Sequence, residues 1–179
     1  MYAYDKLFSE YNHTVAQILL TGLDLQNPER YKNIKSTMTR LLEMSVLPII
    51  NENDTIATDE IAVGDNDTLS AIVAVCMNAD LLVLLSDIDG LYTADPHKNK
   101  DAKLIEEVAE ITPEIEALGG GKGSALGTGG MQTKISAAKL CTENGTDVVI
   151  ANGFDPRVLY DITDKKSVGT RFIAGGMKK

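Results

Sequence analysis

One segment of this chain combines residue types that could hold a phosphate. Seven residues of the segment 119–130 are glycine, and the segment leads directly into a helical pattern that carries Lys134. Glycine lets backbone N–H groups turn toward an anion, and the N-terminus of a helix adds partial positive charge. Lys134 would add a full positive charge. As bare composition, the same glycines are equally consistent with a flexible connection.

The glycine-rich segment matches neither of two common nucleotide-binding patterns. The pattern G-x-x-x-x-G-K-[ST] does not occur, because the lysine of "GKG" (121–123) is followed by glycine. The pattern G-x-G-x-x-G also fails, since Gln132 occupies its last position. The assignment as a phosphate loop therefore depends on what surrounds it.

Two acid–amide clusters, "INEND" (50–54) and "VGDND" (63–67), are the second candidate for chemistry. Turn formation and helix capping alone would explain Asp65 and Asn66 in most proteins. The alternative is ligand binding, because carboxylates can hold an ammonium group and amides can hold a carboxylate. Ser86 and Asp87 form a third candidate, which is either a simple strand terminus or the wall of a nucleotide pocket.

The elements that would position these residues alternate between strands and helices. Such alternation predicts an α/β fold, a three-layer αβα sandwich with a mostly parallel central sheet. Ligands bind such sheets at the carboxyl ends of the strands, so we expect the polar segments to gather at one edge. The predicted strands are 14–21, 46–50, 81–86, 147–153 and 169–174, and the predicted helices are 1–11, 27–45, one following residue 67, 111–120, 131–144 and 155–162.

The composition excludes several classes of function. With 17 basic and 26 acidic residues the formal net charge is −9, which disfavours nucleic acids and anionic membranes as partners. Cys76 and Cys141 lie in apolar helical patterns and are expected to be buried thiols. His13 and His97 are isolated, so neither a zinc site nor a histidine-centred mechanism is expected. We find no membrane-spanning pattern and expect a cytoplasmic protein.

Three motifs together resemble the glutamate 5-kinases of the amino acid kinase family. They are "INENDTIATDEIAVGDND" (50–67), "LLSDIDGLYTADP" (84–96) and "GTGGMQTK" (127–134). The similarity extends from about residue 1 to about residue 174. It implies transfer of a phosphoryl group from ATP, with Mg²⁺, to the γ-carboxylate of L-glutamate. The product would be L-glutamyl 5-phosphate, formed in the first step of proline biosynthesis.

The resemblance also implies roles for individual residues. Asp54 and Asn66 would contact glutamate, and Asp67 would orient the catalytic lysines. Lys134 would stabilise the moving phosphoryl group, and no metal-ligand signature is assigned. The residues implied to contact the nucleotide are Ser86, Asp87, Thr128, Gly129, Gly130, Met131, Gln132, Thr133 and Lys134.

The chain departs from the family pattern in one respect. Family members begin with a strand leading to a K-x-G-[ST] loop and later carry a serine-glycine-alanine loop, and this sequence has neither. We therefore expect residues 1–179 to be a single, N-terminally truncated kinase domain without a C-terminal RNA-binding-like domain. The alternative is a non-catalytic nucleotide-binding fragment or subunit. The family further implies a homo-oligomer, a dimer or tetramer, and proline as a feedback inhibitor.

Overall fold

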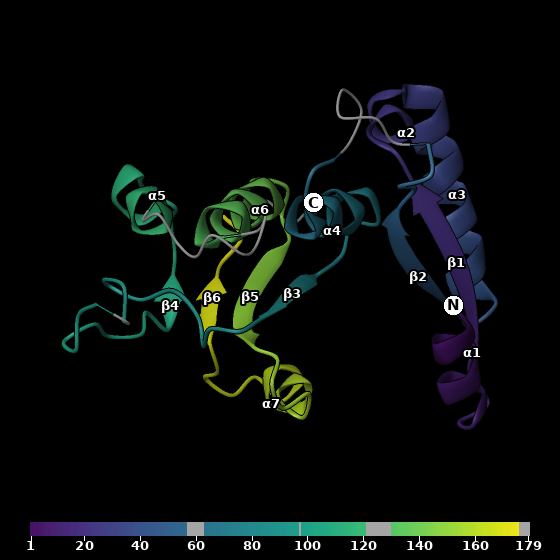
Figure 1. The fold of residues 1–179 in the computed structure, drawn as a ribbon. Helices are drawn as coiled ribbons and strands as arrows, with labels where there is room; N and C mark the ends of the chain where they lie inside the picture. Colours follow the sequence, from purple (N-terminus) through teal and green to yellow (C-terminus); the bar gives the residue numbers. More distant parts are fainter. Residues whose placement is uncertain (57–62, 97, 121–129, 176–179) are drawn as a thin grey trace. The chain divides into compact units, whose positions relative to one another are not determined.

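The chain folds into two compact units. The computed structural model describes residues 1–56, 63–96, 98–120 and 130–175. The first unit comprises residues 1–69 and the second residues 70–179. Figure 1 shows the elements of both. The boundary between the two units falls inside the helix Asn66–Cys76. That the two units form a single domain stays a prediction.

The first unit contains a two-stranded parallel sheet. Strand β1 (Thr14–Leu20) pairs with β2 (Val46–Glu52), and helix α3 (Pro28–Glu43) connects the two strands and packs on β2. A short helix, α1 (Tyr2–Ser9), precedes β1 (Figure 1). Helix α3 begins as the sequence predicts, because the Asn27 side chain accepts the first free N–H groups of the helix.

The sequence prediction missed helix α2 (Gly22–Gln26). It begins with a capping box, in which the backbone N–H and the hydroxyl of Thr21 both donate to Asp24 Oδ2, at 2.9 and 2.7 Å. The hydrogen bond from the Thr21 side chain is the main cause of the lowered pKa of Asp24. The pattern T-x-x-D at 21–24 was the available signal, since an acid three residues after a threonine is typical of a helix start.

The second unit is built on a four-stranded sheet. The strands lie in the order β3 (Leu81–Ser86), β5 (Asp147–Asn152), β6 (Thr170–Phe172) and β4 (Glu107–Val108). The pairs β3–β5 and β4–β6 are parallel, and β5–β6 is antiparallel. The mostly parallel sheet is therefore confirmed. Strand β4 was not predicted, because two residues carry no readable alternation.

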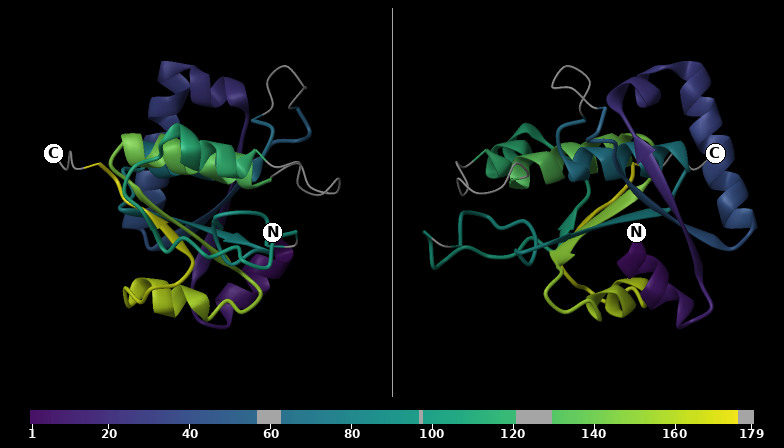
Figure 2. Two further views of the ribbon diagram at one scale, coloured as in Figure 1. Left: turned by 90° about the vertical axis from the view of Figure 1, so that its left-hand side faces the viewer. Right: turned by 45° about the vertical axis from the view of Figure 1, so that its right-hand side comes forward.

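Helices cover both faces of this sheet. Helices α4 (Asn66–Cys76), α5 (Pro113–Gly119) and α6 (Met131–Glu143) pack on one face, and α7 (Val158–Thr163) packs on the other. Figure 2 shows α5 and α6 on the opposite side of the strands from α7. The αβα sandwich is confirmed for this unit. No helix among the described residues has the length and apolar character needed to cross a bilayer.

The two cysteines are buried free thiols, as the sequence predicts. Cys141 lies on α6, and its sulfur is 3.8 Å from the carbonyl oxygen of Ala71 on α4. Burial raises the pKa of the Cys141 thiol to about 11. Since burial disfavours the thiolate, ionisation of this group must oppose folding.

This burial predicts an alkaline loss of stability. The thiol ionises more easily in the unfolded chain, so the free energy of unfolding falls as pH rises above about 9 and stops falling near pH 11. At pH 10.5 the loss should be roughly 2 kcal/mol relative to pH 8. Urea unfolding of the wild type and of Cys141→Ala at both pH values would measure it. The variant should lack this part of the loss, and equal losses in both proteins would contradict the prediction.

Candidate functional site

The carboxyl ends of β3 and β5 meet at one hollow in the second unit. Their register ends with Ser86 opposite Asn152, so the residues that follow both strands lie side by side. The hollow has a volume of about 480 Å³. It is lined by Leu85, Ser86, Asp87, Asn152, Gly153 and Phe154. Open α/β sheets bind ligands in this position, and the hollow contains both residues predicted to form a nucleotide-pocket wall.

Hydrogen bonds join the two segments that form this hollow. The Gly153 N–H donates to the Ser86 carbonyl oxygen at 2.8 Å. The Asn152 Nδ2 group donates to Asp89 Oδ1 at 2.9 Å, and the Tyr92 hydroxyl donates to Asp89 Oδ2 at 3.0 Å. Burial, with a smaller contribution from Asp89, raises the pKa of Tyr92. Asp89 and Asn152 are thus structural members of the site that sequence reasoning did not select.

A buried threonine fixes the far end of the loop that follows β3. Thr170 Oγ1 accepts the N–H of Leu91 at 2.7 Å and donates to the carbonyl oxygen of Ile105 at 2.6 Å. Gly90 allows this approach, because a Cβ atom there would lie 2.5 Å from Thr170 Oγ1. The Ser86–Gly90 segment is therefore held at both ends, which limits how far Asp87 can move.

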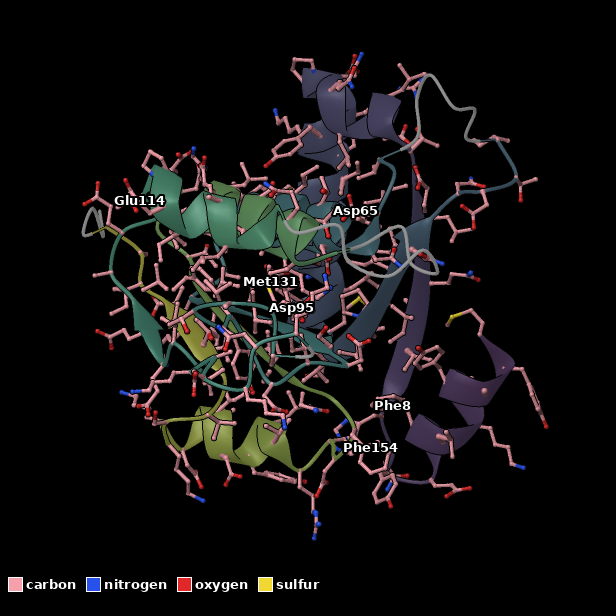
Figure 3. The ribbon with its side chains drawn as sticks, turned by 60° about the vertical axis from the view of Figure 1, so that its left-hand side comes forward. Phe8, Asp65, Asp95, Glu114, Met131 and Phe154 are labelled. Atoms are coloured by element: carbon pink, nitrogen blue, oxygen red, sulfur yellow. The ribbon has the colours of Figure 1, made fainter. Side chains whose placement is uncertain are left out.

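Helix α6 carries Lys134 in its first turn. Gly130 is the N-cap and provides no side-chain cap, while the Thr133 hydroxyl donates to the Gly130 carbonyl oxygen at 2.8 Å. Lys134 is 9% exposed, and Met131, labelled in Figure 3, packs against the core. A largely buried lysine in the first turn of a helix is unusual and is consistent with a positioned charge.

The described residues of the predicted phosphate loop do not line the hollow beside Ser86 and Asp87. Gln132 lines a separate hollow of about 360 Å³ formed with side chains of α5 and α6. The end of α5 approaches the start of α6 closely, because a Cβ atom on Gly119 would lie 3.1 Å from the Cα atom of Gln132. Thr128 and Gly129 lie outside the described residues.

The first unit holds the two acid–amide clusters. The Val63 N–H donates to Glu52 Oε1 at 2.6 Å and so joins the segment that follows β2 to the segment that precedes α4. Asp54 is exposed in a turn, Asn66 is exposed at the start of α4, and Asp67 is half-buried. The structure therefore brings the two clusters together through Glu52, a residue to which sequence reasoning gave no role of its own.

Asp65, labelled in Figure 3, caps helix α4. Its Oδ1 accepts the Thr68 N–H at 2.7 Å and its Oδ2 accepts the Thr68 hydroxyl at 2.8 Å. The structural interpretation of this residue, helix capping, is thus confirmed. Asn66 and Asp67 follow this cap as the first two residues of α4.

Loss of this cap should destabilise the protein modestly. Asp65→Ala removes both acceptors and should lower the free energy of unfolding by about 1 kcal/mol. Asp65→Asn keeps an acceptor oxygen and should lie much closer to the wild type. Urea unfolding of the three proteins measures the difference, and equal stability of the alanine and asparagine variants would argue against the cap.

The predicted site residues divide between the two units. Asp54, Asn66 and Asp67 belong to the first unit, and Ser86 and Lys134 belong to the second. It stays a prediction that these residues of the two units line one shared crevice.

Sequence comparison places the chain among known proteins. The profile of the amino acid kinase family matches residues 1–152. A glutamate 5-kinase from Clostridium perfringens is 53% identical over 178 residues, which cover 97% of this chain and 66% of that protein. A glutamate 5-kinase from Carboxydothermus hydrogenoformans is 56% identical over 172 residues, which cover 96% of this chain and 46% of that protein. The chain spans about half to two thirds of the length of the curated relatives it matches.

Solved structures show the same fold at low sequence identity. Carbamate kinase from Giardia lamblia, bound to AMP-PNP, superimposes with a TM-score of 0.66 at 22% identity and covers 97% of this chain and 67% of that one. UMP kinase from Ureaplasma parvum gives a TM-score of 0.64 at 16% identity, covering 96% of this chain and 65% of that one. At these identities the likeness concerns the fold alone.

Proposed function

This chain belongs to the amino acid kinase family, and from that membership we propose that the protein phosphorylates L-glutamate with ATP. The acceptor is the γ-carboxylate and the product is L-glutamyl 5-phosphate, the first intermediate of proline biosynthesis. The observation that carries the proposal is a sequence identity of more than 50% to glutamate 5-kinases along nearly the whole chain. The hollow at the carboxyl ends of β3 and β5 supports it, because it has the position and polar rim of a nucleotide site.

The reaction needs little acid–base chemistry. A γ-carboxylate has a reference pKa of about 4.3 and is already ionised at neutral pH, so no general base is required. One of its oxygens attacks the γ-phosphorus of ATP, the bond from that phosphorus to the bridging oxygen breaks, and ADP leaves. Catalysis of such a step rests on positioning and on neutralising phosphate charge.

Lys134 and the start of α6 are proposed to supply that neutralisation. The ammonium group would pair with the transferring phosphoryl group, and backbone N–H groups of the first helical turn would face the phosphates. The proposed nucleotide contacts also include Ser86, Asp87 and the segment 128–133. Thr133 supports this arrangement indirectly, since its hydroxyl closes the first turn on Gly130.

The acid–amide clusters of the first unit are proposed to hold glutamate. Asp54 would pair with the α-ammonium group, and Asn66 would donate to a carboxylate without adding negative charge. Asp67 would orient the catalytic lysine. The hydrogen bond between Glu52 and Val63 supports this assignment, because it fixes the segments of Asp54 and Asn66 relative to each other.

Mg²⁺ fits the proposed nucleotide site as a companion of ATP. In phosphoryl-transfer sites Mg²⁺ is held by phosphate oxygens and by one or two carboxylates, and Asp87 offers an exposed carboxylate on the rim of the hollow. Within the described ranges no group of three or more His, Cys, Asp or Glu residues could hold a metal ion. When bound, Mg²⁺ would neutralise part of the phosphate charge.

The same family membership leads to four broader proposals. The two units would form one kinase domain, and the protein would act as a dimer or tetramer in the cytoplasm. Proline, the end product of the proposed pathway, would inhibit it by feedback.

Glutamate-dependent formation of an acyl phosphate tests the proposed function. Hydroxylamine traps the acyl phosphate as a hydroxamate, and release of ADP provides a second readout. Both signals should require ATP and L-glutamate, and D-glutamate or L-aspartate should give far less product. ATP binding without glutamate-dependent turnover would favour the alternative, a nucleotide-binding subunit.

A further inference from the structure

We infer that Phe154 is the surface on which the base of the bound nucleotide stacks. The inference rests on the proposed function, because it assigns one more contact within the same nucleotide site. Phe154 lies in the segment between β5 and α7 (Figure 3) and belongs to none of the three motifs that suggested the function. It would therefore be a binding residue that the motifs do not reveal.

The position of Phe154 is what distinguishes it from an ordinary exposed apolar residue. The residue is 96% exposed, the highest value among the exposed large apolar residues of the described chain. It also lines the hollow that contains Ser86 and Asp87, at the carboxyl ends of two parallel strands. A single exposed apolar residue is common on protein surfaces, but an exposed aromatic ring at the rim of a ligand-sized hollow is the typical platform for a planar ligand.

Hydrogen bonds and close packing hold the backbone that carries this ring. The Phe154 N–H donates to Asn152 Oδ1 at 2.9 Å, and the Nδ2 group of the same asparagine donates to Asp89. The preceding Gly153 lies directly on the end of β3, where a Cβ atom would be 2.9 Å from the Cβ atom of Leu85. Because the backbone before the ring is anchored, only the side-chain torsions of Phe154 would have to be ordered when a ligand stacks on it.

A second apolar surface lies in the same hollow. Leu81 and Val83 point to the face of the sheet that α7 covers, and Leu85 follows in the same alternation at the end of the strand. Leu85 remains 44% exposed and lines the hollow together with Phe154. The two apolar side chains and the polar rim of Ser86, Asp87 and Asn152 match the two parts of a nucleoside, a flat base and a hydroxylated sugar.

The size of the hollow agrees with this occupant. About 480 Å³ falls in the range of roughly 300 to 1,000 Å³ typical of small-molecule sites. A second hollow of about 690 Å³ lies against Phe154 and is lined by residues of the α7 segment, including Asp155 and Asp161. We assign the base to the first hollow because only that one includes Ser86 and Asp87 at the strand ends.

A tryptophan substitution gives a direct test. The chain contains no tryptophan, so Phe154→Trp introduces the sole indole while keeping an aromatic ring at this position. ATP should quench its fluorescence, whereas tripolyphosphate, which lacks a base, should not. Tyr2→Trp is the matched control, because Tyr2 is 80% exposed on α1, and its fluorescence should respond to neither probe.

Truncation of the ring provides the second measurement. Phe154→Ala should weaken ATP binding to this chain on the order of tenfold by calorimetry and leave tripolyphosphate binding unchanged. Unchanged ATP affinity would overturn the stacking role and leave the proposed kinase activity intact. An equal loss for both probes would also overturn it, since the ring would then support the loop. A wild-type chain that binds neither probe would contradict the proposed nucleotide site itself, and the inference with it.

Discussion

Replacing Lys134 by methionine is expected to lower the glutamate-dependent kcat by about 10²- to 10³-fold, the usual effect of removing one charged or donor group that stabilises a transition state. Lys134 is nearly buried in the first turn of α6, and methionine keeps most of the packing volume of its stem. The KM for glutamate should change little, because the interaction proposed for Lys134 is with the moving phosphoryl group. Hydroxamate formation at saturating ATP and varied glutamate concentration measures both constants.

The same helix offers a matched control for this prediction. Lys139 is exposed on α6, and its ammonium group pairs with Glu116 of α5. Its replacement by methionine removes an equal charge from the same helix, and kcat should stay within about twofold because an exposed ion pair contributes little. If Lys134→Met were to keep wild-type turnover, Lys134 would have no place in the mechanism.

Replacing Gly169 by alanine is expected to lower the free energy of unfolding more than an alanine at any other described glycine. Gly169 has a φ of +70°, a conformation that L residues with a Cβ atom rarely adopt. A Cβ atom there would lie 2.2 Å from the carbonyl oxygen of Ile150, so the start of β6 would have to move away from β5. We expect a loss of about 4 kcal/mol in the free energy of unfolding, measured by urea titration.

Gly175→Ala separates this clash from the general effect of adding a methyl group. A Cβ atom on Gly175 would have no neighbour within 4 Å, and its φ is not in the left-handed region. That variant should match the wild type within about 0.5 kcal/mol. Equal stability of the two alanine variants would contradict the close approach of β5 and β6 at Gly169.

The sequence predicted most of the elements because their signals are local. Continuous apolar runs predicted β3 and β5, and Asn27 with Pro28 predicted the start of α3. Helix α7 begins later than predicted, at Val158, because Asp155 accepts the N–H of Arg157 and keeps the preceding residues in a turn. Here a side-chain contact overrode the helical propensity of the segment.

The buried face of α4 shows a different limit. The spacing of large apolar residues predicts a buried face made of Leu69, Ile72, Val73, Cys76 and Met77. Leu69 and Cys76 are buried as predicted, but Ile72, Val73 and Met77 are only partly buried. The small residues Ala71 and Ala74, which were not predicted, are buried as well. Cys141 of α6 lies against the Ala71 carbonyl oxygen, so the two helices approach closely and small residues fill their contact. The spacing of apolar residues predicts which face of a helix is buried. The distance to the neighbouring helix decides which side-chain size fits at each position of that face.

The sequence by itself determined the residue types of the site and the family that uses them, since motifs are contiguous and composition is local. Only the tertiary structure decided which distant residues meet: Asn152 with Asp89, Thr170 with Leu91, and Phe154 with the hollow beside Ser86. The physical reason is that strand pairing and close backbone approach set these neighbours. A pairing of β3 with β5 brings together residues more than 60 positions apart, and no local pattern records it.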